Sequence, residues 1–303
     1  MSRASPGGVG QRSLLLGRRL YKRYLGYTFR RVRGGQRSGN WVFKAISSRE
    51  LGGTRRVAWR RLGMSLCALA LVGAAMASLA QGFRRPYRIQ QNDPPATEFI
   101  AARWHFGTNG AIGHMGWSHN YPNSDRNLND FLVRATGVDV EEYSFLIVEL
   151  GSEDVFEYPF AYVSEPGEMQ LTDQEVINLR EFIDKGGFVL IDDFDGPAQW
   201  NQMRSQVLRA FPDRDFVALD VTHPAFSAYM PLDDLQAMSQ YVPGGSITYY
   251  GLFNDAGHVA ILAGHNNDLA NFWDWYANGA MPLEPSTDAF RLGANAVIYS
   301  FTH

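Results

Sequence analysis

Three aspartates follow a single apolar run within the segment Leu179–Gly196. Phe188–Ile191 is continuously apolar, and Asp192, Asp193 and Asp195 come directly after it. Carboxylates gathered where a buried strand ends repel one another unless a cation or protons hold them together. We therefore predict a binding site here. A structural alternative stays open, because Asp195 stands before a helix whose free N–H groups a carboxylate stabilises, and strand neighbours point to opposite faces.

Histidines and another aspartate stand after other apolar runs. His223 precedes Pro224, and His265 and Asp268 lie in the segment "GHNNDL". Imidazole and carboxylate groups together can hold a divalent cation. The metal ligands that we predict are Asp192, Asp193 and His265. No H-E-x-x-H motif is present, and a structural role for both histidines remains an alternative.

The segment Trp104–Asn123 is expected to be an unusually long loop after the first strand. Loops of about 20 residues are uncommon and are often functional. Its aromatic and polar side chains would suit stacking and hydrogen bonding to a sugar ring, although aromatic residues also serve loop packing. The segment lacks the G-x-S-x-G pattern of a serine nucleophile and the G-K-[ST] ending of a phosphate loop. The candidates in it are Trp104, His105, Trp117 and His119.

Strands and helices alternate along residues 98–303. The continuously apolar run at residues 188–191 is typical of a strand covered on both faces, as in a parallel sheet. The pattern predicts a single α/β domain with a mostly parallel sheet and helices on both faces. Strands are expected at 98–104, 145–150, 159–164, 188–191, 216–219, 246–253 and 258–264. Helices are expected from Ser124 as N-cap, from a capping box of Thr172 and Glu175, from Pro197, and over the closing residues 286–303.

The charge is divided unevenly along the chain. Residues 1–61 carry a net charge of +15, whereas the remainder carries −18. The acidic balance excludes nucleic acid as an expected partner of the domain. We interpret residues 1–61 as a basic extension, either disordered or produced by a misplaced start, with a nucleic-acid-binding tail as the alternative.

Residues 62–80 predict export. The segment is uncharged, follows Arg60 and Arg61, and ends in the small residues that a signal peptidase needs. An uncleaved membrane anchor is the alternative, and it too places the following domain outside the cytoplasm. Residues 81–97 are polar and proline-bearing, which is typical of a linker. The only cysteine is Cys67, so residues 98–303 have no cysteine nucleophile, disulfide or cysteine metal ligand.

Several segments resemble a known bacterial family. They are "RNLNDFLVRATG", "LRAFPD", "THPAF", "NNDLANFW" and, most distinctively, "YPF" at Tyr158–Phe160 and "GGFVLIDD" at Gly186–Asp193. Together they resemble domain of unknown function 4159 over roughly Glu98 to His303. The resemblance implies a flavodoxin-like fold, similar to class I glutamine amidotransferases, in exported or membrane-associated proteins without an established reaction.

Two hypotheses of function follow. The first is a periplasmic or other extracytoplasmic domain that binds a small molecule, a glycan, a divalent metal ion or an envelope protein without catalysis. The second is a metal-assisted hydrolase that uses the aspartates and histidines at the carboxyl edge of the sheet. The missing nucleophile and zinc motifs favour the first. A membrane contact through residues 62–80 is expected if that segment is not cleaved.

Overall fold

The structure is a computed structural model that describes residues 91–110, 116–238 and 245–303. These residues belong to one compact unit, Pro86–His303. The interpretations of residues 1–61, 62–80 and 81–90 lie outside the described residues. In the part of the chain that the structure describes, no helix has the length and apolar character needed to cross a membrane.

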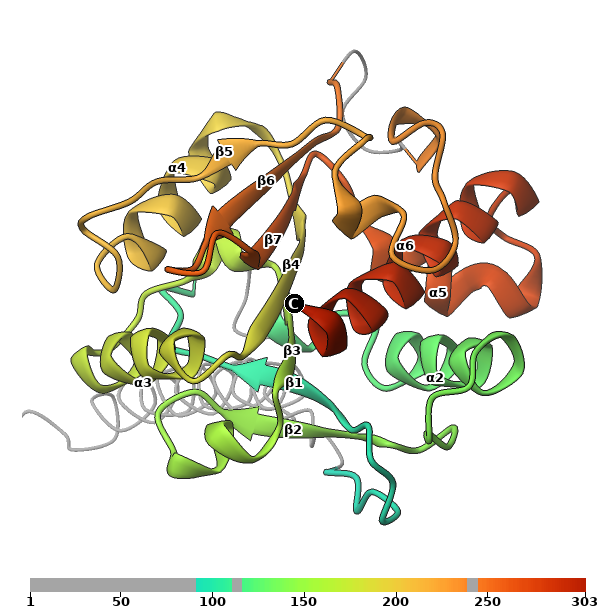
Figure 1. Cartoon of the computed structure of the whole chain (residues 1–303), viewed down its shortest axis with the longest axis horizontal. Coiled ribbons are helices and arrows are strands. Elements are labelled where there is room, and N and C mark those ends of the chain that lie inside the picture. Colours follow the sequence, from blue (N-terminus) through green and yellow to red (C-terminus); the bar gives the residue numbers. More distant parts are fainter. Residues whose placement is uncertain (1–90, 111–115, 239–244) are drawn as a thin grey trace, which may run out of the picture. The chain divides into compact units, whose positions relative to one another are not determined.

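Seven strands form one sheet within the described residues, in the order β2-β1-β3-β4-β7-β6-β5 (Figure 1). The first five strands in this order are parallel, whereas β6 pairs antiparallel with β7 and β5 antiparallel with β6. The predicted α/β class and mostly parallel sheet are therefore confirmed. The strands are β1 (Ala101–His105), β2 (Phe145–Glu149), β3 (Phe160–Ser164), β4 (Phe188–Phe194), β5 (Val217–Ala218), β6 (Thr248–Phe253) and β7 (Val259–His265).

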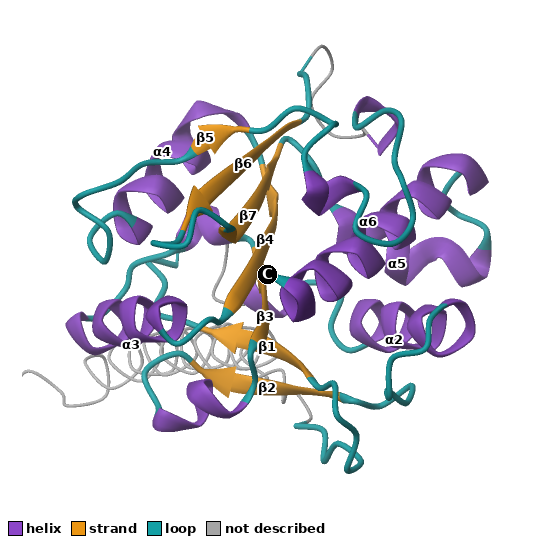
Figure 2. Cartoon of the chain, viewed as in Figure 1, coloured by secondary structure: helices purple, strands orange, loops and turns teal. Residues whose placement is uncertain are grey.

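Helices cover both faces of this sheet, as Figure 2 shows. Leu190 of β4 packs in one hydrophobic cluster, and its neighbours Val189 and Ile191 pack in a second cluster on the opposite face. The first cluster includes α2 (Asn123–Ala135), α5 (Leu269–Trp275) and α6 (Leu283–Thr302); the second includes α3 (Asp173–Asp184) and α4 (Gly196–Val207). Burial on both faces explains why β4 is continuously apolar. The short 3-10 helices are η1 (Gly116–Ser118), η2 (Glu153–Glu157), η3 (Pro166–Glu168), η4 (Pro224–Phe226), η5 (Gln236–Met238) and η6 (Tyr276–Asn278).

Of two helix starts predicted from local sequence signals, the structure confirms one and contradicts the other. The capping box is confirmed, because the Glu175 N–H donates to Thr172 Oγ1 over 3.2 Å and the Thr172 N–H donates to Glu175 Oε2 over 2.7 Å. In contrast, α2 begins at Asn123, and Ser124 lies in its first turn instead of capping it. The prediction for Ser124 was wrong because its hydroxyl is used in a buried contact with Arg103.

Two further elements differ from expectation at the carboxyl end of the chain. The strand expected at 216–219 is reduced to the two exposed residues of β5 at the sheet edge. No helix was predicted between β7 and the closing helix, but α5 begins at Leu269, shortly after β7 ends at His265. Asp268 is the N-cap of this helix and accepts a hydrogen bond of 2.8 Å from the Asn271 N–H. This local cap fixes where the helix starts.

One buried arginine joins β1 to the residues before α2. Arg103 is 1% exposed, and its Nη2 lies 2.6 Å from Asp125 Oδ2. Its Nη1 donates to the backbone oxygens of Trp117 and His119, over 3.1 and 3.2 Å. The guanidinium also stands over the Tyr162 ring, 4.6 Å from its centroid. The Arg103 guanidinium therefore fixes the course of the chain between β1 and α2.

Asp125→Asn should destabilise the protein strongly, because it leaves the Arg103 charge buried without its partner. Breaking a buried ion pair costs roughly 3–5 kcal/mol, whereas an exposed helical pair contributes about 0.3–0.5 kcal/mol. Urea denaturation measures the change in the free energy of unfolding. Asp184→Asn is the matched control, since Asp184 pairs with Arg180 over 2.9 Å on the surface of α3. Equal losses in the two variants would contradict the role given to Arg103.

Candidate functional site

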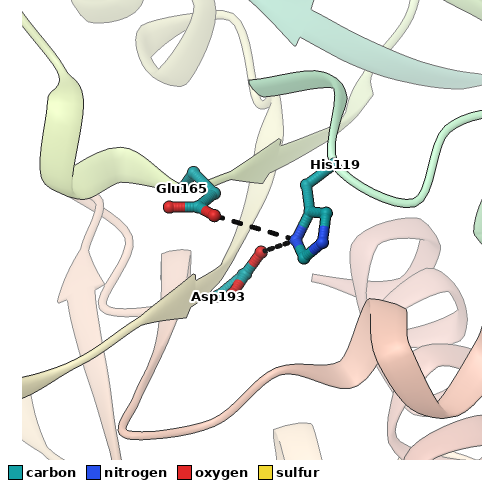
Figure 3. Close-up of side chains that lie close together, drawn as sticks. All are labelled: His119, Glu165 and Asp193. Atoms are coloured by element: carbon teal, nitrogen blue, oxygen red, sulfur yellow. Dashed lines mark hydrogen bonds and ion pairs between the residues drawn. The ribbon is translucent and has the colours of Figure 1, made fainter. Parts of the chain in front are cut away.

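The carboxyl ends of β1, β3 and β4 bring three ionisable side chains together (Figure 3). His119 comes from the loop after β1, Glu165 directly follows β3, and Asp193 lies near the end of β4. His119 Nδ1 lies 2.7 Å from Asp193 Oδ2 and 3.7 Å from Glu165 Oε1. One ligand atom of each residue lies within 4.8 Å of the other two. We call these three residues the edge cluster.

The backbone at the edge cluster adopts a conformation that L-residues rarely take. Glu165 has φ 52°, Asp193 has φ 65° and Asn120, next to His119, has φ 60°. Such left-handed positions cost of order 1 kcal/mol or more each when the residue is not glycine, and they gather at functional sites. At Asp193 the β4–β7 register is also irregular between Ile191 and Phe194. The irregular backbone lets Asp193 leave the alternation of the strand and join the cluster.

Asp192 points into the protein and has a structural role. Its side chain is fully buried, and Oδ2 accepts hydrogen bonds from the Tyr162 hydroxyl over 2.7 Å and from the N–H groups of Leu269 and Ala270 over 2.7 and 3.1 Å. Burial, followed by the charge of Asp193, raises the pKa of Asp192 to about 7. This carboxyl group anchors the start of α5 against β3 and β4.

Two members of the edge cluster, Glu165 and His119, have raised pKa values. Burial, followed by the charge of Asp193, raises the pKa of Glu165 to about 7. The hydrogen bond to Asp193 is the main cause that raises the pKa of His119. The His119 side chain is 45% exposed, against 17% for Glu165 and 14% for Asp193. The cluster is thus open to solvent on its imidazole side.

A buried carboxylate without hydrogen-bond partners among the described residues lies next to Glu165 of the edge cluster. Glu168, three residues after Glu165, is fully buried, and neither of its carboxylate oxygens has a hydrogen-bond partner within the described residues. A Cβ on Gly116 would lie 3.2 Å from Glu168 Oε2 and 2.7 Å from Glu165 Cβ, so η1 approaches these glutamates closely. Buried carboxylates without partners are costly. Protons or a cation would relieve that cost.

The other predicted residues of the aspartate-rich edge lie outside the cluster. Asp195 occupies the N-cap position of α4 without a side-chain capping bond, and burial, followed by the charge of Asp193, raises its pKa. A ring nitrogen of His265, Nε2, lies 3.0 Å from the Gly196 backbone oxygen, and the ring packs 5.5 Å from that of Trp200. Among the described residues, the predicted set of Asp192, Asp193 and His265 does not converge, whereas the edge cluster does.

The remaining candidates take packing or capping roles. Trp104 is buried with its ring 4.9 Å from that of Phe182. His105 pairs with Glu149 over 2.6 Å, and the buried Trp117 packs 4.2 Å from the His105 ring. His223 caps η4, since its Nδ1 accepts from the Ala225 N–H over 3.2 Å. His114, in the segment Trp104–Asn123, lies outside the described residues.

Sequence reasoning missed Glu165, Glu168 and Arg103. A signal for Glu165 was available, because it directly follows the apolar run at 160–164 and the carboxyl ends of parallel strands meet at one edge. No local pattern indicated that Arg103, inside an apolar strand, would find a buried acidic partner.

A comparison with protein families gives one match. Residues 107–301 match the family described as Domain of unknown function (DUF4159). The chain belongs to this family. The DUF4159 match includes all three residues of the edge cluster and leaves out β1, which carries Arg103. A search of curated proteins finds none that matches the chain.

Without metal, the free energy of unfolding should fall as the pH rises from about 4 to 8. The folded-state pKa values of Glu165 and Asp192 are raised to about 7, and that of His119 is raised above 6.5. The folded protein therefore binds more protons than the unfolded chain, and this stabilisation is lost as the pH passes the folded pKa values. Each group contributes a slope of at most about 1.4 kcal/mol per pH unit. Urea denaturation in EDTA at pH 5, 6, 7 and 8 measures this change in the free energy of unfolding.

Glu165→Gln should make this slope shallower, because the amide does not titrate. Glu149→Gln provides the control, since the Glu149 side chain is 63% exposed and lies in the pair with His105. An equal dependence of the unfolding free energy on pH in the Glu165→Gln variant and in the unaltered protein would show that Glu165 is not protonated near neutral pH.

Proposed function

We propose that this chain is an exported domain that binds a divalent cation through His119, Glu165 and Asp193 and uses it to hold a ligand without catalysis. The observation that carries the proposal is the convergence of three ligand atoms, within 4.8 Å of one another, from the ends of three different strands. An ion about 2.1 Å from each ligand keeps the ligand atoms within about 4.2 Å of one another. The 2.7 and 3.7 Å separations at His119 Nδ1 are compatible with this.

The ligand set favours a transition metal ion. One imidazole and two carboxylates suit Zn²⁺ or Mn²⁺, whereas Ca²⁺ and Mg²⁺ prefer oxygen ligands alone. Three protein ligands leave at least one position open for water or a ligand atom. The exposed imidazole side gives that position access to solvent. The pKa values of His119 and Glu165 are raised, so that protons would compete with the cation for these side chains.

A flavodoxin-like fold is part of the proposal. The five parallel strands run β2-β1-β3-β4-β7, which corresponds to the flavodoxin order 2-1-3-4-5. In such sheets, ligands bind outside the carboxyl ends of the strands next to the point where the strand order reverses, here between β1 and β3. His119 and Glu165 follow these two strands. The similarity to class I glutamine amidotransferases does not extend to a cysteine nucleophile, because Cys67 is the only cysteine.

The location is proposed from the sequence. The uncharged segment at 62–80, after a strongly basic region, supports export by a signal peptide or an anchor. The domain would then act in the periplasm or on the outer side of the inner membrane. Its ligand would be a small molecule, a glycan or an envelope protein, and the net charge of −18 after residue 61 disfavours nucleic acid.

Zn²⁺ or Mn²⁺ should raise the melting temperature at pH 7.5, because an ion that binds only the folded protein stabilises it. At 100 times its dissociation constant the gain is about 2.7 kcal/mol. Thermal denaturation with each chloride salt, against EDTA, measures the shift. His119→Ala and Asp193→Asn should abolish it, whereas His105→Ala, from the similar histidine–glutamate pair with Glu149, should keep it. A shift that survives both cluster variants would place the ion elsewhere.

The second candidate is a metal-assisted hydrolase. One observation favours it: Glu165 Oε1 lies 3.7 Å from His119 Nδ1, so that, if His119 and Asp193 alone hold the cation, Glu165 could act as a general base on a cation-bound water. Zn²⁺- or Mn²⁺-loaded protein would then hydrolyse p-nitrophenyl esters, phosphates or glycosides, and Glu165→Gln would remove that turnover while the fold survives. Absence of turnover in the loaded protein favours the binding function.

A further inference from the structure

A groove of about 390 Å³ lies beside His119. Its walls are the loop before α2 and the end of α5, and they present His119, Asn120, Asn123, Asp274 and Trp275. The groove therefore shares the imidazole of His119 with the edge cluster. The loop and helix come from positions about 150 residues apart, and the Asn120 side chain joins them by a hydrogen bond of 3.0 Å to Asp274 Oδ2.

Trp275 provides a fixed aromatic surface in this groove. It is 43% exposed, although a large apolar side chain is usually buried. Its Nε1 donates a hydrogen bond of 3.1 Å to Asn271 Oδ1, one turn earlier in α5, which holds the orientation of the indole ring. An exposed ring whose orientation is already fixed loses little conformational entropy when a flat ligand stacks on it.

Planar polar groups surround the indole. Asn120 Nδ2 donates to Asn271 Oδ1 over 2.9 Å as well as to Asp274, and Asn120 Oδ1 is shielded from solvent without a partner among the described residues. Asn123 is exposed at the mouth of the groove. An amide offers a donor and an acceptor side by side, and a carboxylate accepts hydrogen bonds in pairs, as neighbouring hydroxyl groups of a sugar require. No lysine or arginine is among the described residues that line the groove.

We infer that this groove is a subsite for one pyranose ring of a neutral or amino sugar, stacked on Trp275. An aromatic face with planar polar groups at its edge suits a ring that has an apolar C–H face and a rim of hydroxyl groups. Asp274 and the absence of lysine and arginine from the described lining disfavour sugars that carry a carboxylate or phosphate when the metal ion is removed. The inference rests on the proposed function, because it names the ligand that the cation beside His119 would help to hold.

Titration with monosaccharides tests the subsite. D-glucose, D-galactose, D-mannose, D-glucosamine and N-acetyl-D-glucosamine are added to the Zn²⁺-loaded protein, and saturation-transfer NMR and calorimetry measure binding. A ring of about a dozen non-hydrogen atoms is expected to bind with a dissociation constant of about 1 mM. In EDTA, where no metal ion can coordinate its carboxylate, D-glucuronate is expected to bind at least tenfold more weakly than the neutral sugars. No binding of any neutral or amino sugar to the Zn²⁺-loaded protein up to 50 times that constant, or equal binding of glucuronate in EDTA, overturns the inference.

Trp275→Ala should weaken binding about tenfold or more, because the stacking surface is lost. Tyr276→Ala is the matched control: Tyr276 is the next residue and is 50% exposed, but its ring packs on Phe290 in a different groove. Binding should be unchanged in this control. Equal affinities of the Trp275→Ala variant and the unaltered protein contradict the stacking role.

Two variants distinguish an error in the proposed sugar subsite from an error in the proposed metal centre. Trp275→Ala should keep the Zn²⁺-dependent rise in melting temperature, since Trp275 supplies no metal ligand. Glu165→Gln in EDTA removes the cation and should weaken sugar binding without removing the selectivity against glucuronate. Sugar binding that is identical with and without Zn²⁺ would support the subsite but overturn its link to the cation.

Discussion

The site depends on the burial of one positive charge. Arg103 lies in the middle of β1, between β2 and β3, where a guanidinium must be fully paired to be tolerated. Asp125 supplies the compensating charge, and the backbone oxygens of Trp117 and His119 take up donors that would otherwise be unpaired. Because these oxygens belong to the loop between β1 and α2, the hydrogen bonds that stabilise the guanidinium also fix this loop. The position of the His119 imidazole above the sheet edge follows from this.

The second constraint is the burial of acidic side chains at the sheet edge. The neighbours Asp192 and Asp193 meet it in different ways. Asp192 points inward, where its carboxyl group accepts hydrogen bonds from the Tyr162 hydroxyl and from the first N–H groups of α5. Asp193 is turned by its left-handed backbone toward His119 and Glu165. The two neighbours therefore point in different directions, because the left-handed backbone turns Asp193 out of the strand alternation. This separates the structural carboxyl group of Asp192 from that of the edge cluster. The buried Glu168 carboxylate stays without a partner in the described residues.

The candidate metal centre and the groove beside it share the loop between β1 and α2. Asn120 follows His119 and has a left-handed conformation, and its amide reaches α5 while His119 faces Asp193. Movement of this loop would consequently alter both places. Because the pKa values of His119 and Glu165 are raised, protons would compete with the proposed cation, and pH would then influence the proposed sugar binding in the groove.

The sequence by itself determined the features that depend on composition and local pattern. The apolar run of β4 indicated a strand buried on both faces, the Thr172–Glu175 pair indicated the start of α3, and the alternation of elements indicated the α/β class. It also placed Asp193 at the carboxyl edge, because a residue after a parallel strand must lie there. Only the tertiary structure decided which residues meet at that edge. Asp193 joins His119, 74 residues earlier, and not His265, because its direction depends on a left-handed backbone and on loop positions fixed by a buried arginine. These are long-range contacts, and no local pattern encodes them.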